Sequence, residues 1–120
     1  MLSRKEKMFY LKKRIEISAA HSLMLDYKTK CERLHGHNWN IIVYCKSETL
    51  DENGMVVDFT HIKKKIVDQL DHQNLNEVLS EINPTSENIA KWICEQIPHC
   101  YKVTVQETAD NEVSYEKDTL

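Results

Sequence analysis

The chain has 120 residues, of which 41% are hydrophobic and 29% are charged, and its formal net charge is −3. This length fits a single domain, and a domain this small often hides its sheet edges by forming an oligomer. The weak negative charge argues against general nucleic-acid binding, and no stretch approaches the about 20 apolar residues that span a bilayer.

The extent of the domain and its compartment are predicted from the termini and the cysteines. We expect one domain over residues 1–120, with 1–8 as a disordered extension and 117–120 as a tail. The first residues are charged and lack the apolar segment of a secretory signal. The four cysteines show no C-x-x-C spacing, so we predict reduced thiols in the cytoplasm. Cys45 and Cys94 lie in periodic segments and are expected in the core.

Two strands are expected in the first half of the chain. Apolar and polar residues alternate over residues 10–20, which is typical of a half-buried strand, and His21 closes it. A second strand is predicted over residues 35–46, and its continuous apolar run at 41–43 predicts that both of its faces are covered. A polar turn follows, and then a short extended piece at residues 55–57.

Two helices are expected next. Asp58 can cap the first, which is indicated by an apolar stripe at helical spacing made of Phe59, Ile62, Ile66 and Leu70. A connector is predicted over residues 78–83. Thr85 or Ser86 can then cap a second helix, which ends at Pro98.

The last predicted elements are strands at residues 101–108 and 113–116, joined by a hairpin turn. The element order is then β-β-α-α-β-β, which indicates an α+β domain with a small sheet. Glu107 ends the apolar face of the first of these strands. Its carboxylate either emerges into water or stays buried and binds a cationic or amidine-like partner.

Three histidines carry the clearest chemical signal. His35 and His37 are two residues apart in a predicted strand, so both imidazoles face the same side. Gly36 between them leaves the opposite face open to close approach by another backbone. His21 closes the other predicted strand. Three neutral imidazoles around one point suit zinc, and a fourth position left to water or substrate is typical of a catalytic site.

Other interpretations of these residues are open from the sequence alone. The histidines can be ordinary core or surface residues, since an H-G-H triplet by itself is weak evidence. Cys31, four residues before His35, can lie beside the metal or act as the fourth ligand of a closed structural site. Asp71 can orient the adjacent His72, or His72 can be a helix-end residue favoured by the helix dipole.

Five motifs in matching order, running from about Tyr10 to Tyr115, resemble the 6-pyruvoyltetrahydropterin synthase family. They are Ala19-Ala20-His21, Cys31-x-x-x-His35-Gly36-His37, Leu70-Asp71-His72-x-x-Leu75-Asn76, Pro84-Thr85-Ser86-Glu87 and Val103-x-Val105-x-Glu107-Thr108. The resemblance implies a T-fold, in which a four-stranded antiparallel sheet carries two antiparallel helices on one face. It also implies a homo-oligomer, expected as a hexamer of two stacked trimers, with active sites between subunits.

The three-residue gap between Cys31 and His35 is similar to the branch that makes 6-carboxytetrahydropterin. That branch implies a lyase acting on 7,8-dihydroneopterin triphosphate, with acetaldehyde and triphosphate as the other products, in 7-deazaguanine and queuosine synthesis. The resemblance implies Zn²⁺ on His21, His35 and His37 as a Lewis acid for the substrate side chain. It implies Cys31 as the base that takes protons from side-chain carbons.

The same resemblance assigns the remaining catalytic residues. His72, oriented by Asp71, would transfer a second proton, and Glu107 would anchor the pterin ring and belong to the proton relay. The alternatives are a pyruvoyl-type synthase that eliminates triphosphate without cleaving the side chain, and a zinc-binding or pterin-binding module without turnover. A related branch carries glutamate in place of the cysteine, and Glu32 adjoins Cys31 here.

Overall fold

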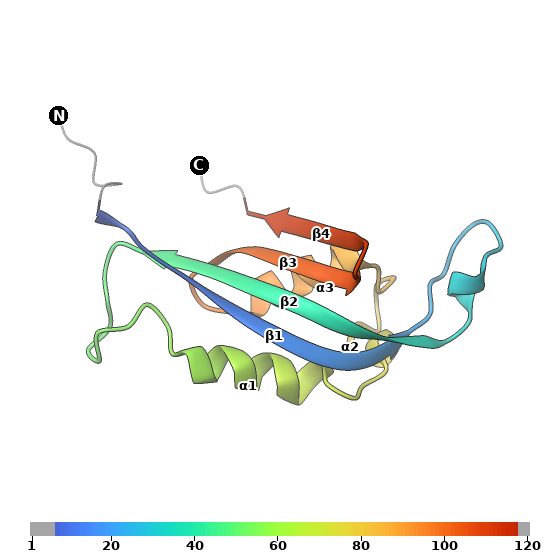
Figure 1. Ribbon diagram of the computed structural model, residues 1–120, viewed down its shortest axis with the longest axis horizontal. Helices are drawn as coiled ribbons and strands as arrows, with labels where there is room; N and C mark the ends of the chain where they lie inside the picture. The colour runs from blue at the N-terminus through green and yellow to red at the C-terminus, as the bar shows by residue number, and fades with distance from the viewer. Residues whose placement is uncertain (1–6, 118–120) are drawn as a thin grey trace.

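The computed structural model describes residues 7–117, so the expectations for residues 1–6 and 118–120 lie outside the described residues. Four strands form one antiparallel sheet in the order β1-β2-β3-β4 (Figure 1). The strands are β1 (Phe9–His21), β2 (His35–Ser47), β3 (Cys100–Thr108) and β4 (Asn111–Glu116). The helices are the 3₁₀ turn η2 (Lys30–Glu32) and α1 (Phe59–Leu70), α2 (Leu75–Val78) and α3 (Ser86–Gln96).

The three α-helices cover one face of the sheet, and α1 and α3 run in opposite directions (Figure 1). Alternation along the strands sends the apolar side chains to this face, where the helices bury them. The strand residues of this core are Ile15, Ile17, Ala19, Trp39, Ile41, Val43, Cys45, Val103 and Val105. The α+β fold expected from the sequence is therefore confirmed, and the core includes Cys45 and Cys94 as predicted.

Local capping explains where the helices begin. The Asp58 side chain accepts a hydrogen bond from the Thr60 N–H, and the Thr85 side chain accepts one from the Asn88 N–H. Each bond satisfies a backbone donor that the first helical turn leaves unpaired. Thr85 rather than Ser86 is thus the cap of α3, and Ser86 becomes its first residue.

Three sequence-based expectations were wrong in detail. Phe59 is 50% exposed, because helical side chains lean toward the N-terminus and this residue has no earlier turn to pack over. The piece at residues 55–57, expected to be extended, bends instead, and the Met55 carbonyl accepts the Asp51 N–H in a turn. Ile42 is only half-buried, because none of the described helices covers its face of the sheet.

Two segments differ from their predicted limits. The short helix α2 was missed, since its single turn is too brief for a periodic signal, although Leu75 is fully buried in it. The last strand begins at Asn111, two residues earlier than expected, because the hairpin turn is confined to residues 109–110. Among the described residues, no helix is long and apolar enough to cross a membrane.

Candidate functional site

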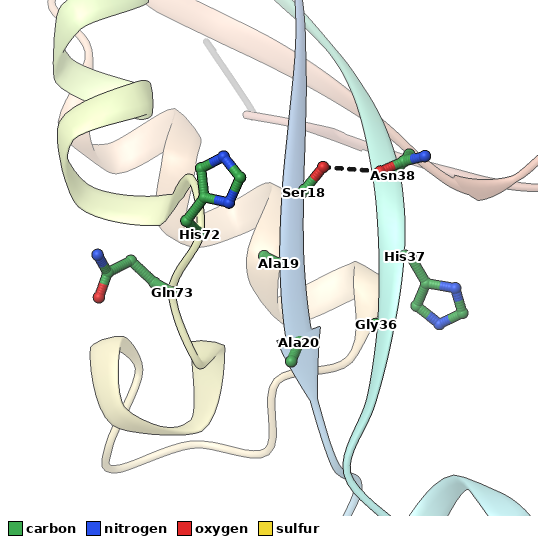
Figure 2. Close-up of a pocket in the computed structure, with 8 residues that line it drawn as sticks. All are labelled: Ser18, Ala19, Ala20, Gly36, His37, Asn38, His72 and Gln73. Atoms are coloured by element: carbon green, nitrogen blue, oxygen red, sulfur yellow. Dashed lines mark hydrogen bonds between the residues drawn. The ribbon is translucent and has the colours of Figure 1, made fainter.

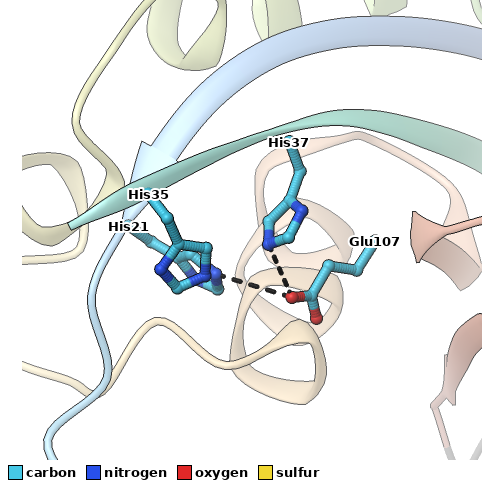
Figure 3. A group of neighbouring side chains, drawn as sticks. All are labelled: His21, His35, His37 and Glu107. Carbon is cyan, nitrogen blue, oxygen red and sulfur yellow. Dashed lines mark ion pairs between the residues drawn. The ribbon is translucent and has the colours of Figure 1, made fainter. Parts of the chain in front are cut away.

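The register between β1 and β2 brings the three histidines together. His21 pairs with His35, and Ala19 pairs with His37, at the end of the two long strands. The three residues lie on the helix-covered side, and their ring centroids are 4.7 to 5.3 Å apart. Figure 3 shows the rings gathered around one point, as the sequence predicted.

Backbone carbonyls fix which nitrogen each ring presents. The Nδ1 of His21 lies 2.8 Å from the Pro84 carbonyl oxygen, and the Nδ1 of His35 lies 2.7 Å from the Arg33 carbonyl oxygen. A carbonyl only accepts, so each Nδ1 donates and each neutral ring keeps a lone pair on Nε2. Both rings are therefore oriented as metal ligands are, with the second nitrogen held by a backbone oxygen.

Burial also keeps His21 in its ligand form. Its side chain is 1% exposed, and this burial lowers the pKa of the imidazole below its ordinary value. The hydrogen bond to Pro84 raises the pKa but acts less strongly than burial, and the neighbouring His35 lowers it further. His21 is thus neutral at pH 7, which is the form that binds a metal.

Glu107 from β3 completes the group. Its Oε2 atom lies 2.7 Å from His37 Nε2 and 3.7 Å from His21 Nε2. The four candidate ligand atoms of His21, His35, His37 and Glu107 all lie within 4.8 Å of one another (Figure 3). The Nε2 atoms of His21 and His37 are buried and have no hydrogen-bond partner within residues 7–117. Buried polar atoms without a partner are costly, and three imidazoles with one carboxylate suit a divalent metal ion, so these residues fit such an ion.

Cys31 lies next to this group without belonging to it. It sits in η2 and is partly exposed, and it lines a surface hollow together with His35, Lys30 and Arg33. The Cys31 carbonyl accepts a hydrogen bond of 2.8 Å from the Leu23 N–H, which ties this loop to the end of β1. A closed structural site would have the three histidines and Cys31 as its four ligands. The group that the structure brings together has Glu107, not Cys31, as its fourth member.

Asp71 and His72 are held at the outer edge of β1, away from the histidine group. Asp71 Oδ1 accepts the Ser18 N–H at 2.9 Å, and the His72 N–H donates to the Ser18 carbonyl at 2.6 Å. His72 has a φ of 59°, a left-handed conformation that is strained for a residue with a side chain. Its ring is 81% exposed and projects from the opposite side of the β1–β2 pair to His37 (Figure 2).

The Asp71 carboxylate is near the His72 ring but is not hydrogen-bonded to it, since Oδ2 and Nε2 are 3.7 Å apart. Asp71 instead fixes the backbone from which His72 projects. His72 also lines a surface hollow together with Ser18, Ala20, Gly36, His37 and Asn38.

Two supporting residues were not assigned a site role from the sequence. The Ser86 hydroxyl donates a hydrogen bond to Glu107 Oε1 at 3.2 Å. The Trp39 ring packs against the rings of His21 and His37, with centroid distances of 4.9 and 5.2 Å. Strand alternation could have placed Trp39 beside His37, because the two residues share a face. Contact between Ser86 and Glu107 spans 21 positions in the chain, so no local pattern predicts it.

A four-stranded antiparallel sheet with its helices on one face and three histidines converging at one end defines a T-fold protein with a site suited to a metal. The protein-family model described as 6-pyruvoyl tetrahydropterin synthase matches residues 10–118 of the chain. The chain therefore belongs to the 6-pyruvoyl tetrahydropterin synthase family, which confirms the resemblance seen in its motifs.

Individual relatives agree with this assignment. The 6-carboxy-5,6,7,8-tetrahydropterin synthase of Synechocystis sp. is 36% identical over 121 residues, which cover 90% of this chain and 93% of the relative. The dihydroneopterin monophosphate aldolase of Pyrococcus furiosus is 40% identical over 87 residues, or 70% of each chain. The structure of Caenorhabditis elegans 6-pyruvoyl tetrahydropterin synthase superposes with a TM-score of 0.74 at 29% identity, covering 92% of this chain and 96% of the other.

Proposed function

We propose that this protein is a zinc-dependent 6-carboxy-5,6,7,8-tetrahydropterin synthase. It converts 7,8-dihydroneopterin triphosphate and water to 6-carboxytetrahydropterin, acetaldehyde and triphosphate, a step toward 7-deazaguanine and queuosine compounds. The observation that carries this proposal is the convergence of His21, His35 and His37, with the Cys31 thiol in a hollow that it shares with His35. The Synechocystis sp. relative supports the choice of branch.

The three histidines would hold the ion through their Nε2 atoms. When bound, zinc supplies Lewis acidity, which stabilises negative charge on the side-chain oxygens of the substrate as protons leave carbon. As a thiolate, Cys31 would accept such a proton at its sulfur, since it is partly exposed and borders the proposed ligand His35. Hydrogen moved from the side chain to the ring reduces the ring internally, so no redox cofactor is required.

Glu107 would anchor the pterin. It lies in a hollow of about 380 Å³ with Thr85, Ser86 and Leu23, beside His21. A carboxylate there can accept two hydrogen bonds from the amino-pyrimidinone edge of the ring, a paired and charge-assisted contact. That arrangement would direct the substrate side chain toward the histidines.

His72 would serve the active site of a neighbouring copy in a homo-oligomer. The support for this is its exposure at the edge of β1, on the far side of the strand pair from His37 (Figure 2). The strained backbone of His72, fixed by the two hydrogen bonds to Ser18, would aim the ring outward as a proton donor or acceptor. Asp71 would position that backbone.

The direct test is to incubate the zinc-loaded protein with 7,8-dihydroneopterin triphosphate and identify the products by mass spectrometry. The expected products are 6-carboxytetrahydropterin and acetaldehyde. Cys31→Ala should keep zinc and lose turnover, whereas Cys94→Ala, which alters a buried thiol of the core, should keep both. Zinc loss in Cys31→Ala would instead indicate a closed four-ligand site and overturn the proposed role of the thiol.

A second test addresses the sharing of residues between copies. Cys31→Ala and His72→Ala should each be inactive alone. Mixed oligomers formed by refolding the two variants together should regain part of the activity, because some sites would receive both intact residues. Mixed oligomers that stay inactive would contradict the assignment of His72 to a neighbour's site.

Two relatives favour alternative reactions. If the protein resembles the C. elegans 6-pyruvoyl tetrahydropterin synthase in activity, substrate is consumed without release of acetaldehyde. The P. furiosus relative is named a dihydroneopterin monophosphate aldolase, so the monophosphate is a second candidate substrate. A related branch of the family carries glutamate in place of the cysteine, and in this chain Glu32 adjoins Cys31. Parallel assays with the monophosphate and the triphosphate decide between these reactions. Zinc and pterin binding without turnover of either substrate would indicate a non-catalytic binding module.

A further inference from the structure

The Glu107 carboxylate occupies a place that the pterin-anchoring role does not explain. Its Oε2 atom approaches His37 Nε2 to 2.7 Å and His21 Nε2 to 3.7 Å (Figure 3). Neither nitrogen has a hydrogen-bond partner among the described residues, although the approach to His37 is as short as that of an ion pair. Ligand atoms that face one common point without hydrogen-bonding each other are arranged as around a cation.

The second carboxylate oxygen has a separate partner. Glu107 Oε1 accepts the hydroxyl hydrogen of Ser86, the buried first residue of α3, at 3.2 Å. This hydrogen bond orients the carboxylate so that only Oε2 faces the histidines. Glu107 thus presents a single oxygen to the histidine group, while Ser86 holds the other oxygen.

Charge gives a reason for this arrangement. Three neutral imidazoles leave a divalent ion with both of its charges in a site where His21 is almost fully buried. A buried charge is unfavourable unless it is paired, so an adjacent carboxylate stabilises the ion before any substrate arrives. Glu107 is the carboxylate in the group that can do this.

The two roles of Glu107 compete for the same carboxylate oxygens. A pterin ring edge takes both carboxylate oxygens, whereas the observed position commits Oε1 to Ser86 and Oε2 to the histidine group. We propose, on the basis of the function above, that Glu107 is a displaceable fourth ligand. In the resting protein it closes the metal site, and the incoming pterin ring draws it away, so that the fourth position opens only when substrate is present.

The resting half of this proposal is tested without substrate, on Co²⁺-loaded protein. Co²⁺ affinity is measured by competition with a chelator, and the visible absorption reports the ligand set. Glu107→Gln should bind Co²⁺ about tenfold more weakly or worse and show an altered spectrum. The matched control is Glu112→Gln, since Glu112 lines the same hollow but is outside the ligand group. Circular dichroism verifies that both variants fold, and a Glu107→Gln variant with wild-type affinity and spectrum would overturn the proposal.

The exchange itself is tested with unsubstituted pterin, which has no side chain to reach the metal. Its binding is followed by its own fluorescence. On binding, the Co²⁺ spectrum of the wild-type protein should change, whereas that of Glu107→Gln should not. Bound pterin with an unchanged wild-type spectrum refutes the exchange alone. Failure of pterin to bind the wild-type protein refutes the proposed pterin substrate together with the exchange, and this outcome is distinguishable from the first.

Discussion

Trp39 links the hydrophobic core to the histidine group, and Trp39→Phe tests that link. Its side chain is 1% exposed, its indole N–H donates to the Ala19 carbonyl at 3.0 Å, and its ring contacts His21 and His37. Phenylalanine keeps one ring but cannot donate. The Ala19 carbonyl also faces its ladder partner His37 on β2, so loss of the indole hydrogen bond costs only about 0.5–1.5 kcal/mol. The space left by the second ring costs about 1–2 kcal/mol more.

The expected loss for Trp39→Phe is therefore about 1.5–3.5 kcal/mol, a large part of the about 5–15 kcal/mol typical of a domain. It is measured by urea unfolding of metal-free protein at one fixed concentration, because an oligomer's apparent stability depends on concentration. The matched change Trp92→Phe, at a partly buried indole, should cost less than about 1 kcal/mol. Equal unfolding free energies for Trp39→Phe and the wild-type protein would refute this account of how the site is supported.

Other predictions concern the metal, pH and capping. The His35→Ala variant should purify with less than one zinc ion per chain by elemental analysis, while circular dichroism shows that it still folds. A full zinc content in this variant would show that His35 is not a ligand. Chelation of the wild-type protein should lower its Tm, and an unchanged Tm would contradict a metal bound to the folded state. Because burial lowers the pKa of His21 below 6.5 in the folded protein, the unfolded chain binds more protons under mildly acidic conditions. The unfolding free energy of the metal-free protein should therefore fall as the pH decreases from about 7 to about 5. His21→Gln should make this pH dependence weaker. If the variant keeps the wild-type pH dependence, groups other than His21 cause it. Thr85→Ala should destabilise the protein by about 1 kcal/mol in urea unfolding through loss of the α3 cap, and no change would indicate that Ser86 replaces the cap.

Local patterns in the sequence determined most of the elements. The alternation of β1 and β2 placed both strands to within one residue at each end, and the stripe of α1 gave both of its ends. These patterns succeed because each depends on residues that are close in the chain and on one buried face. The stripe did not identify Phe59 as exposed, since periodicity alone does not locate the end of the core.

The sequence also identified the three histidines as a group. His35 and His37 follow from strand alternation, and His21 from the end of the preceding strand. Their convergence still required the register that sets His21 opposite His35, which the sequence did not state. A shift of one residue would have turned His21 to the other face.

Only the tertiary structure decided the contents of the site around these histidines. It brought Glu107 from β3 into the ligand group, set Ser86 behind it, and held His72 outside on the far side of the β1–β2 pair. These placements join residues separated by long stretches of chain, and they depend on strand order, on the packing of α3 and on hydrogen bonds at the edge of β1. Spacing along a chain predicts which way a side chain faces within one element, but only the packing of whole elements decides which distant side chain it meets.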